Sequence, residues 1–171
     1  MKPMALVAWG FLVVVVDIKI NEFDLVVDFA GWMMCLTGLG RVTQHSRWFG
    51  YALYGCIPGA LLSVPEFFGA DIGPAGGIVL AVAMLTLVFG TCSGIIDCVR
   101  NARTVSTANT IRWWTLALDL IGILVILAVR TGSGTVGPEL VLLVIPGLVL
   151  AIWFAVFLLR VQDEVEMVTA V

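Results

Sequence analysis

Two aspartates lie in a stretch of the chain whose other residues are mostly apolar. In residues 21–32, NEFDLVVDFAGW, Asp24 and Asp28 are one helical turn apart, and Asp119 lies in another apolar stretch. A carboxylate at the centre of a lipid bilayer costs about 2.5 to 3.5 kcal/mol on insertion scales, so it is retained beside a partner or water. Because such residues mark paths for ions and protons, Asp28 and Asp119 are candidate ligands for a proton, a cation or a cationic solute. Asp24 would add to an acidic entrance at the outer surface.

Asp28 and Asp119 each have a structural interpretation as well, and the sequence leaves both open. Asp28 would bond to the start of its own helix or to a neighbouring helix near the outer surface. Asp119 would pair with Arg112 or Arg103 near the inner surface, because an opposite charge offsets the cost of burial. In these cases the carboxylates would fix packing and bind no ligand.

No group of side chains indicates catalysis, a metal or a cofactor. The single histidine, His45, lies in a basic connection, and neither Ser63 nor Ser93 has a neighbouring base in the sequence. The four cysteines form no Cys-x-x-Cys pair and no cluster with histidine, so we expect free thiols that pack as small apolar side chains. A net charge of −3 without clustered lysine and arginine argues against a nucleic-acid partner. We therefore expect no enzyme, no metal site and no cofactor.

The elements that hold the aspartates are predicted to be membrane-spanning helices. Of the 171 residues, 61% are hydrophobic and 12% are charged, and the mean hydropathy is +1.10. Soluble domains are about half apolar and a quarter charged. Several stretches of about 17 to 21 residues carry almost no charge, which is the length that crosses a hydrocarbon layer. The sequence therefore predicts an all-α, polytopic membrane protein with one transmembrane domain over residues 1–171.

Six spans are expected, separated by connections rich in glycine, proline and charge. No small-residue cleavage site follows the first apolar segment, so we interpret this segment as a retained helix and not as a signal peptide. The predicted spans are Met4–Ile20, Phe23–Leu39, Trp48–Val64, Gly76–Ile96, Trp113–Val129 and Leu140–Leu159.

The basic residues give the orientation of these spans. With an inner N-terminus, two of the nine lysines and arginines, Lys19 and Arg130, fall outside. The other seven fall inside, namely Lys2, Arg41, Arg47, Arg100, Arg103, Arg112 and Arg160. An excess of basic residues in short loops marks the cytoplasmic side of a membrane protein. Both termini are therefore predicted to be cytoplasmic, and the connection that contains Glu66 and Asp71 is predicted to face outward.

A short pattern recurs in the two halves of the chain. Asp28-Phe-Ala-Gly31 resembles Asp119-Leu-Ile-Gly122, Pro58-Gly59 resembles Pro146-Gly147, and the aspartate–proline separations are 30 and 27 residues. Units 1–65 and 76–160, with three spans each, would have opposite orientations. Inverted repeats with interrupted helices mark binding sites in secondary transporters. The pattern predicts a 3+3 inverted repeat and makes Pro58, Gly59, Pro146 and Gly147 candidate binding residues. The alternative is that both prolines only kink their helices for packing.

The first third of the chain also carries a motif. Residues 23–32, Gly38-Leu-Gly-Arg41 and Ser46-Arg-Trp-Phe49 resemble a group of small bacterial multispanning membrane proteins with a stretch like Asp-Leu-Leu-Pro-Asp-Phe-Ile-Gly-Tyr. Val27 stands where that group has proline, and Trp32 stands where it has tyrosine. Asp24, Asp28, Phe29, Gly31, Gly38 and Leu39 match. The resemblance implies a multi-pass protein of the bacterial inner membrane and carries no activity with it.

Two functions from different classes are consistent with these features. The first is a transporter or channel for a cation or small solute, which acts in the lipid bilayer as a homo-oligomer, because six short helices leave little room for a path. The second is a non-transporting accessory or immunity-like subunit that binds another membrane protein. Gly55-Cys-Ile-Pro-Gly59 and Gly90-Thr-Cys-Ser-Gly94 provide the close-packing spacing that such binding would use.

Overall fold

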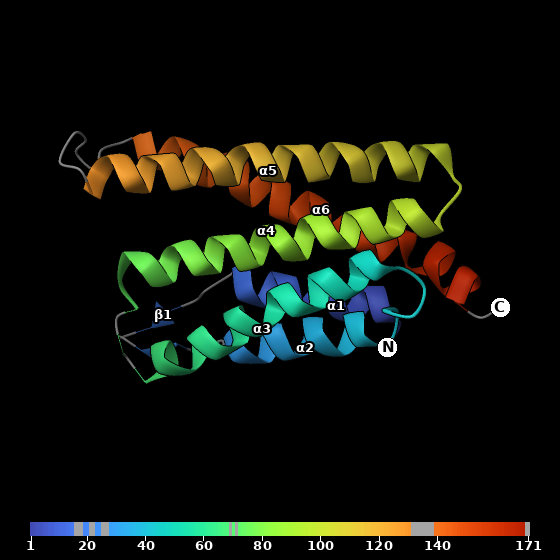
Figure 1. Ribbon diagram of the computed structural model, residues 1–171, viewed down its shortest axis with the longest axis horizontal. Coiled ribbons are helices and arrows are strands. Elements are labelled where there is room, and N and C mark those ends of the chain that lie inside the picture. Colours follow the sequence, from blue (N-terminus) through green and yellow to red (C-terminus); the bar gives the residue numbers. More distant parts are fainter. Residues whose placement is uncertain are drawn as a thin grey trace.

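The computed structural model describes residues 1–15, 19–20, 23–24, 28–68, 70, 72–130 and 139–169. These residues form six α-helices and one pair of two-residue strands (Figure 1). Strands β1 (Lys19–Ile20) and β2 (Phe23–Asp24) pair antiparallel. The helices are α1 (Pro3–Val15), α2 (Asp28–Gly40), α3 (Arg47–Phe67), α4 (Gly73–Cys98), α5 (Ala102–Arg130) and α6 (Glu139–Thr169).

The six helices run up and down along one axis (Figure 1). Both chain termini, the connection from α2 to α3 and the connection from α4 to α5 lie at one end of the bundle, which we call the terminal end. The β1–β2 pair, the end of α3 and the start of α4 lie at the opposite end, which we call the hairpin end. The two termini therefore share a side, as the sequence-based topology requires of an even number of helices.

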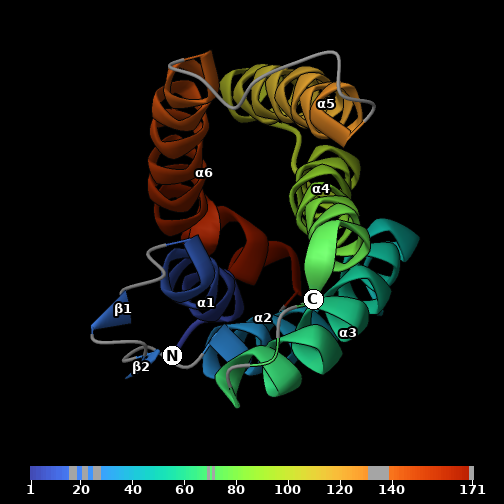
Figure 2. The ribbon, with the colours of Figure 1, turned by 90° about the vertical axis from the view of Figure 1, so that its left-hand side faces the viewer.

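Seen along the axis, the helices form a ring in chain order (Figure 2). Each helix packs on the next one, and α6 returns to pack on α1. Packing is closest between α3 and α4 and between α1 and α2, whereas α5 and α6 contact one another least among these neighbours. The ring is therefore held least firmly where α5 meets α6.

The core is richest toward the terminal end of the bundle. Trp32, Phe49 and Phe154, which come from three different helices, are almost completely buried, and the four cysteines are free thiols, as expected. In contrast, the hairpin-end parts of α5 and α6 expose large apolar side chains, including Leu124 and Val149. These two segments leave the core and present apolar surface outward.

Glycines set the close contacts between helices. A Cβ atom on Gly10 of α1 would lie 2.5 Å from the Gly31 carbonyl oxygen of α2. On α4, a Cβ on Gly90 would lie 2.9 Å from the Ala52 Cβ, and one on Gly94 would lie 2.5 Å from the Phe49 ring. Contacts under about 3 Å do not occur between real atoms of this kind, so only glycine permits these helix separations.

Polar side chains join the helices at the terminal end. Ser46 caps α3, because its hydroxyl oxygen accepts the Trp48 backbone N–H at 3.2 Å and its hydroxyl donates to Asp97 Oδ2 at 2.8 Å. The Glu164 carboxylate of α6 accepts hydrogen bonds from Asn101 Nδ2 (3.1 Å) and Thr104 Oγ1 (3.0 Å). These contacts join α3 to α4 and α6 to the start of α5.

The N-terminus is held to α6 by charge. The Lys2 ammonium pairs with Asp163 and, at 2.8 Å, with Glu166 Oε2. Hydrogen bonding to Asp163 and then to Glu166 raises the pKa of Lys2 above its ordinary value. The acidic segment that contains Asp163 and Glu166 is therefore part of α6 and joins it to the residue before α1.

Several predicted helix boundaries are wrong. The first span ends at Val15 and not at Ile20, and the second starts at Asp28 and not at Phe23, because Phe23 and Asp24 belong to β2. α5 starts at Ala102, eleven residues (113 − 102) before the predicted Trp113, and α6 continues past Leu159 to Thr169. Hydropathy marks where a helix is apolar and not where it ends.

Two helices are long and apolar enough to cross a membrane, as judged over the residues that the structure describes. They are α4 (Gly73–Cys98) and the Val144–Glu166 part of α6. The helix Pro3–Val15 is apolar but shorter. The described residues therefore form six helices, of which two have the length and hydropathy of a membrane span.

Candidate functional site

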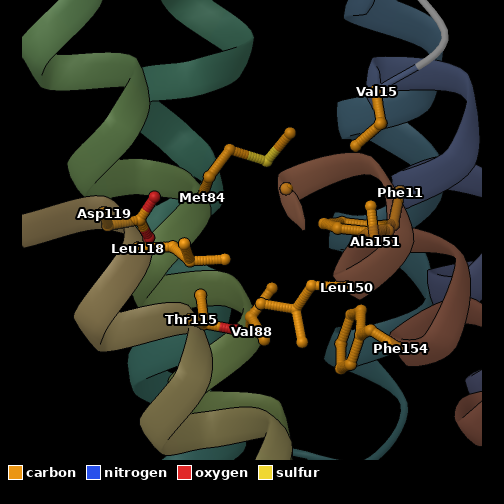
Figure 3. A pocket seen from close by; sticks show the side chains of 11 residues that line it. Phe11, Val15, Met84, Val88, Thr115, Leu118, Asp119, Leu150, Ala151 and Phe154 are labelled. Atoms are coloured by element: carbon orange, nitrogen blue, oxygen red, sulfur yellow. The ribbon is translucent and has the colours of Figure 1, made fainter. Parts of the chain in front are cut away.

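A cavity of about 160 Å³ lies between four helices, α1, α4, α5 and α6 (Figure 3). It lies at the boundary between the buried core and the exposed hairpin-end parts of α5 and α6. The walls are almost entirely apolar. Its lining residues are Phe11, Val15, Met84, Val88, Thr115, Leu118, Asp119, Gly147, Leu150, Ala151 and Phe154.

Among the described residues that line the cavity, only Asp119 has a charged side chain. Its side chain comes from α5 and lies beside Met84 of α4, across the cavity from Phe11 and Phe154 (Figure 3). The Oδ2 atom is buried and has no hydrogen-bond partner within the described part of the chain. A buried carboxylate oxygen without a donor is unfavourable by at least a few kcal/mol unless a proton or a cation satisfies it.

The structural alternative for Asp119, a pairing with Arg112 or Arg103, is wrong. Both ion pairs found among the described side chains involve Lys2. Arg112 donates instead to Ser93 Oγ at 3.3 Å and to Asn109 Oδ1 at 2.7 Å. Seven residues separate Arg112 from Asp119 along α5, which is about 10 Å of helix rise and too far for direct contact. Asp119 is therefore not compensated by this neighbouring cation.

Thr115 is the second polar residue of the cavity, and the sequence did not single it out. It lies four residues before Asp119 on α5, so both side chains are on one face of that helix. The Thr115 hydroxyl donates its hydrogen to the Ile111 carbonyl oxygen at 2.9 Å. Its remaining capacity is that of an acceptor, like that of an ionised carboxylate. The two polar side chains of the cavity thus offer oxygen lone pairs, which suit a cation.

The aromatic wall opposite Asp119 also suits a positive charge. The rings of Phe11 and Phe154 pack edge to face, with centroids 4.9 Å apart. Aromatic faces attract cations by about 0.5 to 2 kcal/mol, depending on solvation. An anion would meet a carboxylate here and no basic side chain. The geometry therefore favours a cationic ligand over an anionic one.

Asp28 does not line this cavity. Asp28 is the first residue of α2 and is half-buried, so it is not one turn inside that helix as the sequence suggested. A carboxylate in the first turn interacts favourably with the helix dipole. Asp24 is the second residue of β2, and the acidic entrance expected from its side chain lies outside what the structure describes, as does Val27.

The proline–glycine pairs have unequal surroundings. Gly147 lines the cavity, and a Cβ atom there would meet nothing within 4 Å, while Pro146 is exposed. Pro58 is half-buried inside α3, and Gly59 packs on the Trp32 ring. Of the predicted binding residues, the cavity brings together Asp119 and Gly147. Neither Asp28 nor Pro58 lines it.

The inverted repeat gains no support from these positions. Asp28 begins its helix, whereas Asp119 lies 17 residues (119 − 102) beyond the first residue of α5. Pro58 is partly covered and Pro146 is exposed. The ring order of the helices is compatible with two three-helix units, and the repeat stays a prediction from the sequence.

Gly59 is expected to act in packing and not in binding. A Cβ atom at this position would lie 2.5 Å from Trp32, whose side chain is 1% exposed and has no room to move. Gly59→Ala should therefore lower the free energy of unfolding by about 1 to 3 kcal/mol, the usual cost of overpacking. Thermal unfolding in detergent measures this effect. The matched control is Gly122→Ala, which meets nothing within 4 Å and should be neutral or slightly stabilising. Equal stability of the two variants would contradict the packing role.

Comparison of the chain with models of protein families, with curated proteins and with solved structures gave no match. The function is therefore argued from the site alone.

Proposed function

We propose that this chain is a small multi-pass membrane protein that binds a small cation at Asp119 and carries or conducts it across the bilayer. The observation that carries this proposal is the buried Asp119 Oδ2 atom, which faces an apolar cavity and has no partner among the described residues. Intramembrane carboxylates of this kind are typical of ion and proton pathways. Thr115 would serve as a second oxygen ligand.

The membrane assignment is supported by the surface of the bundle. Leu61, Leu124 and Val149 are 66%, 57% and 61% exposed, and many other large apolar side chains are exposed with them. Such a surface is poorly tolerated in water but suits lipid. Under this proposal all six helices lie across the bilayer of a bacterial inner membrane, with the terminal end in the cytoplasm. α1 and α2, with 13 residues or about 20 Å each, would be accommodated by local thinning of the bilayer.

Access to the site would come from the weakest part of the ring. α5 and α6 line the cavity from two sides and pack on each other least among the neighbouring helices. A shift of α6 relative to α5 would therefore open the cavity at a smaller loss of packing than any other helix movement. The side chain of Asp119 would then accept the cation, and reclosure would exclude water from it.

Flux assays on proteoliposomes test the proposal. The purified chain would be reconstituted with a gradient of H⁺, Na⁺, K⁺ or tetramethylammonium, and the entry of each ion would be followed. We expect flux of at least one of these cations above that of empty vesicles. Vesicles that stay impermeable to all four, although the chain is inserted, would rule out transport and favour the accessory class.

The alternative function, an accessory subunit that binds another membrane protein, depended on the two Gly-x-x-x-Gly segments as its binding surface. Both Gly-x-x-x-Gly segments are used inside the chain, since Gly55 packs on Thr86 and Gly90 packs on Ala52. A partner would have to use another surface, such as the apolar faces of α5 and α6. We propose that these faces meet in a homodimer, which would also enclose the site more fully.

Topology is expected to follow the basic residues. Single cysteines would be introduced at Ala70 near the hairpin end and at Gln44 near the terminal end, both of which are exposed. In intact cells an impermeant maleimide should label position 70, and position 44 should react only after permeabilisation. A reporter fused after Val171 should be cytoplasmic. Labelling of position 44 from outside would reverse the orientation and with it the direction of the proposed path.

A further inference from the structure

A second hollow, of about 320 Å³, lies over α3, α4 and α5. Four aromatic rings form a continuous wall along it. The Trp48 ring packs edge to face on Tyr51 (centroids 5.6 Å apart) and on Phe89 (6.4 Å), and Phe89 packs in the same way on Trp113 (6.4 Å). Tyr51 and Trp113 are each 53% exposed, so the wall is reached from outside the bundle. We call this hollow the aromatic groove.

Arg112 lies beside two of the rings that line the aromatic groove. Its guanidinium carbon is 5.0 Å from the Phe89 ring centroid and 5.4 Å from that of Trp113. The hydrogen-bond partners of this guanidinium, Ser93 and Asn109, are both neutral. Its Nε atom is buried without a partner, and no described carboxylate forms an ion pair with it. Arg112 is therefore a positive charge without a counter-ion among the described residues, and two rings pack against it.

The lining of the groove changes in character along the axis of the bundle. Trp48 is the second residue of α3, and its ring contacts Phe89, so Arg112 lies near the level at which α3 begins. Tryptophan and arginine are typical of the headgroup level of a membrane. One turn toward the hairpin end, the lining consists of Leu85, Thr86 and Leu116. The groove is thus cationic at the interface and apolar below it.

We propose that the aromatic groove binds one anionic phospholipid, with its phosphate at Arg112 and an acyl chain along Leu116, Leu85 and the aromatic wall. Charge complementarity selects this occupant, because an anionic lipid supplies the counter-charge that Arg112 lacks. A zwitterionic lipid carries its own ammonium group, so it provides less net negative charge to pair with Arg112. The inference rests on the proposed membrane insertion and is independent of the cation site at Asp119.

Native mass spectrometry of the full chain tests the proposal. The chain would be purified from vesicles with equal parts of phosphatidylglycerol and phosphatidylcholine, and the lipid retained per chain would be counted. We expect one phosphatidylglycerol per chain and about a tenfold loss of retention in Arg112→Gln, the loss of one charge-assisted contact. Arg103→Gln removes an exposed arginine of the same helix and should retain lipid as the wild type does.

A second variant tests the groove independently, in case Arg112→Gln loses the lipid only because it misfolds. Leu116→Trp leaves Arg112 intact, fills the groove and should also lose the lipid. Equal retention by the wild type and Arg112→Gln, or equal retention of the two lipids by the wild type, would overturn the proposal. Flotation with vesicles separates this failure from that of the proposed function: a chain that floats but retains no lipid overturns the lipid site alone, whereas a chain that does not float overturns membrane insertion.

Discussion

Asp119→Asn is expected to reduce cation binding or flux about a hundredfold while leaving the chain at least as stable as the wild type. The substitution keeps the shape of the side chain and removes its charge. An interaction with a charged oxygen contributes about 1.5 to 3 kcal/mol, and 2.7 kcal/mol corresponds to a factor of about one hundred in affinity. Because the Oδ2 atom has no donor among the described residues, no hydrogen bond to it is lost. Flux in proteoliposomes and thermal unfolding in detergent give the two readouts.

Asp119→Leu tests through stability whether the carboxylate is kept for function. Leucine has the branching of aspartate and matches the apolar lining of the cavity. Replacing a buried, uncompensated carboxylate in this way should raise the free energy of unfolding by about 1 to 3 kcal/mol. A gain in stability with a loss of activity is the pattern of a residue that is kept for function.

Asp28→Asn is the matched control, because this carboxylate lies at the first turn of α2 and outside the cavity. It should leave flux unchanged and lower stability by about 0.3 to 1 kcal/mol through the weaker interaction with the helix dipole. The assignment of the site fails if flux of the Asp119 variants falls only in proportion to the amount of folded protein, or if Asp28→Asn abolishes flux and Asp119→Asn does not.

The sequence predicted the two central helices well and the first two poorly. α3 and α4 lie within a few residues of their predicted limits, since long apolar stretches with proline or glycine at the ends leave few alternatives. The segment between α1 and α2 contains a strand pair, Lys19–Ile20 with Phe23–Asp24, where the sequence predicted the ends of the first two spans. Helix extension was also missed in α5, where Thr107 and Thr110 satisfy their hydroxyls by donating to carbonyls one turn earlier in the same helix.

The candidate site was predicted only in part, because it is assembled from four helices. Asp119 and Gly147 were recognised from their residue types and spacing. Thr115 was not, although its position four residues before Asp119 is a signal that a search along one helix face would find. Phe11 and Phe154 carry no such signal, since their pairing depends on how α6 returns to α1. The pairing of Asp119 with Arg112 was wrong for the same reason: a sequence gives the charges but not the neighbours that engage Arg112.

The Gly-x-x-x-Gly segments also show that a sequence pattern does not identify the neighbouring element. The sequence identified Gly55-x-x-x-Gly59 and Gly90-x-x-x-Gly94 as surfaces where helices approach closely. In the structure, neighbouring helices do pack closely on these glycines. What the spacing does not give is the identity of the neighbour. Here the neighbours are other helices of the same chain, so the motifs build the ring and leave the faces of α5 and α6 as the apolar surface that lipid or a second copy would cover.

Gly147→Leu is expected to abolish cation flux without any change to Asp119. A Cβ atom at Gly147 meets nothing within 4 Å, and the residue lines the cavity of about 160 Å³, so a leucine side chain would enter that space. It would occupy the volume that a cation with its ligands needs, and flux should fall about a hundredfold or more. The variant should nevertheless be more stable than the wild type by about 0.5 to 1 kcal/mol, because glycine inside a helix is unfavourable relative to residues such as leucine.

Gly122→Leu provides the control for Gly147→Leu. Gly122 of α5 also meets nothing within 4 Å and gains the same helix propensity, but it does not line the cavity. Both variants should therefore show a similar gain in thermal midpoint, and only Gly147→Leu should lose flux. If both keep wild-type flux, the ion path does not use this cavity, and Asp119 acts elsewhere or only in packing. If both lose flux equally, the effect comes from the movement of α5 against α6 and not from the filling of the site.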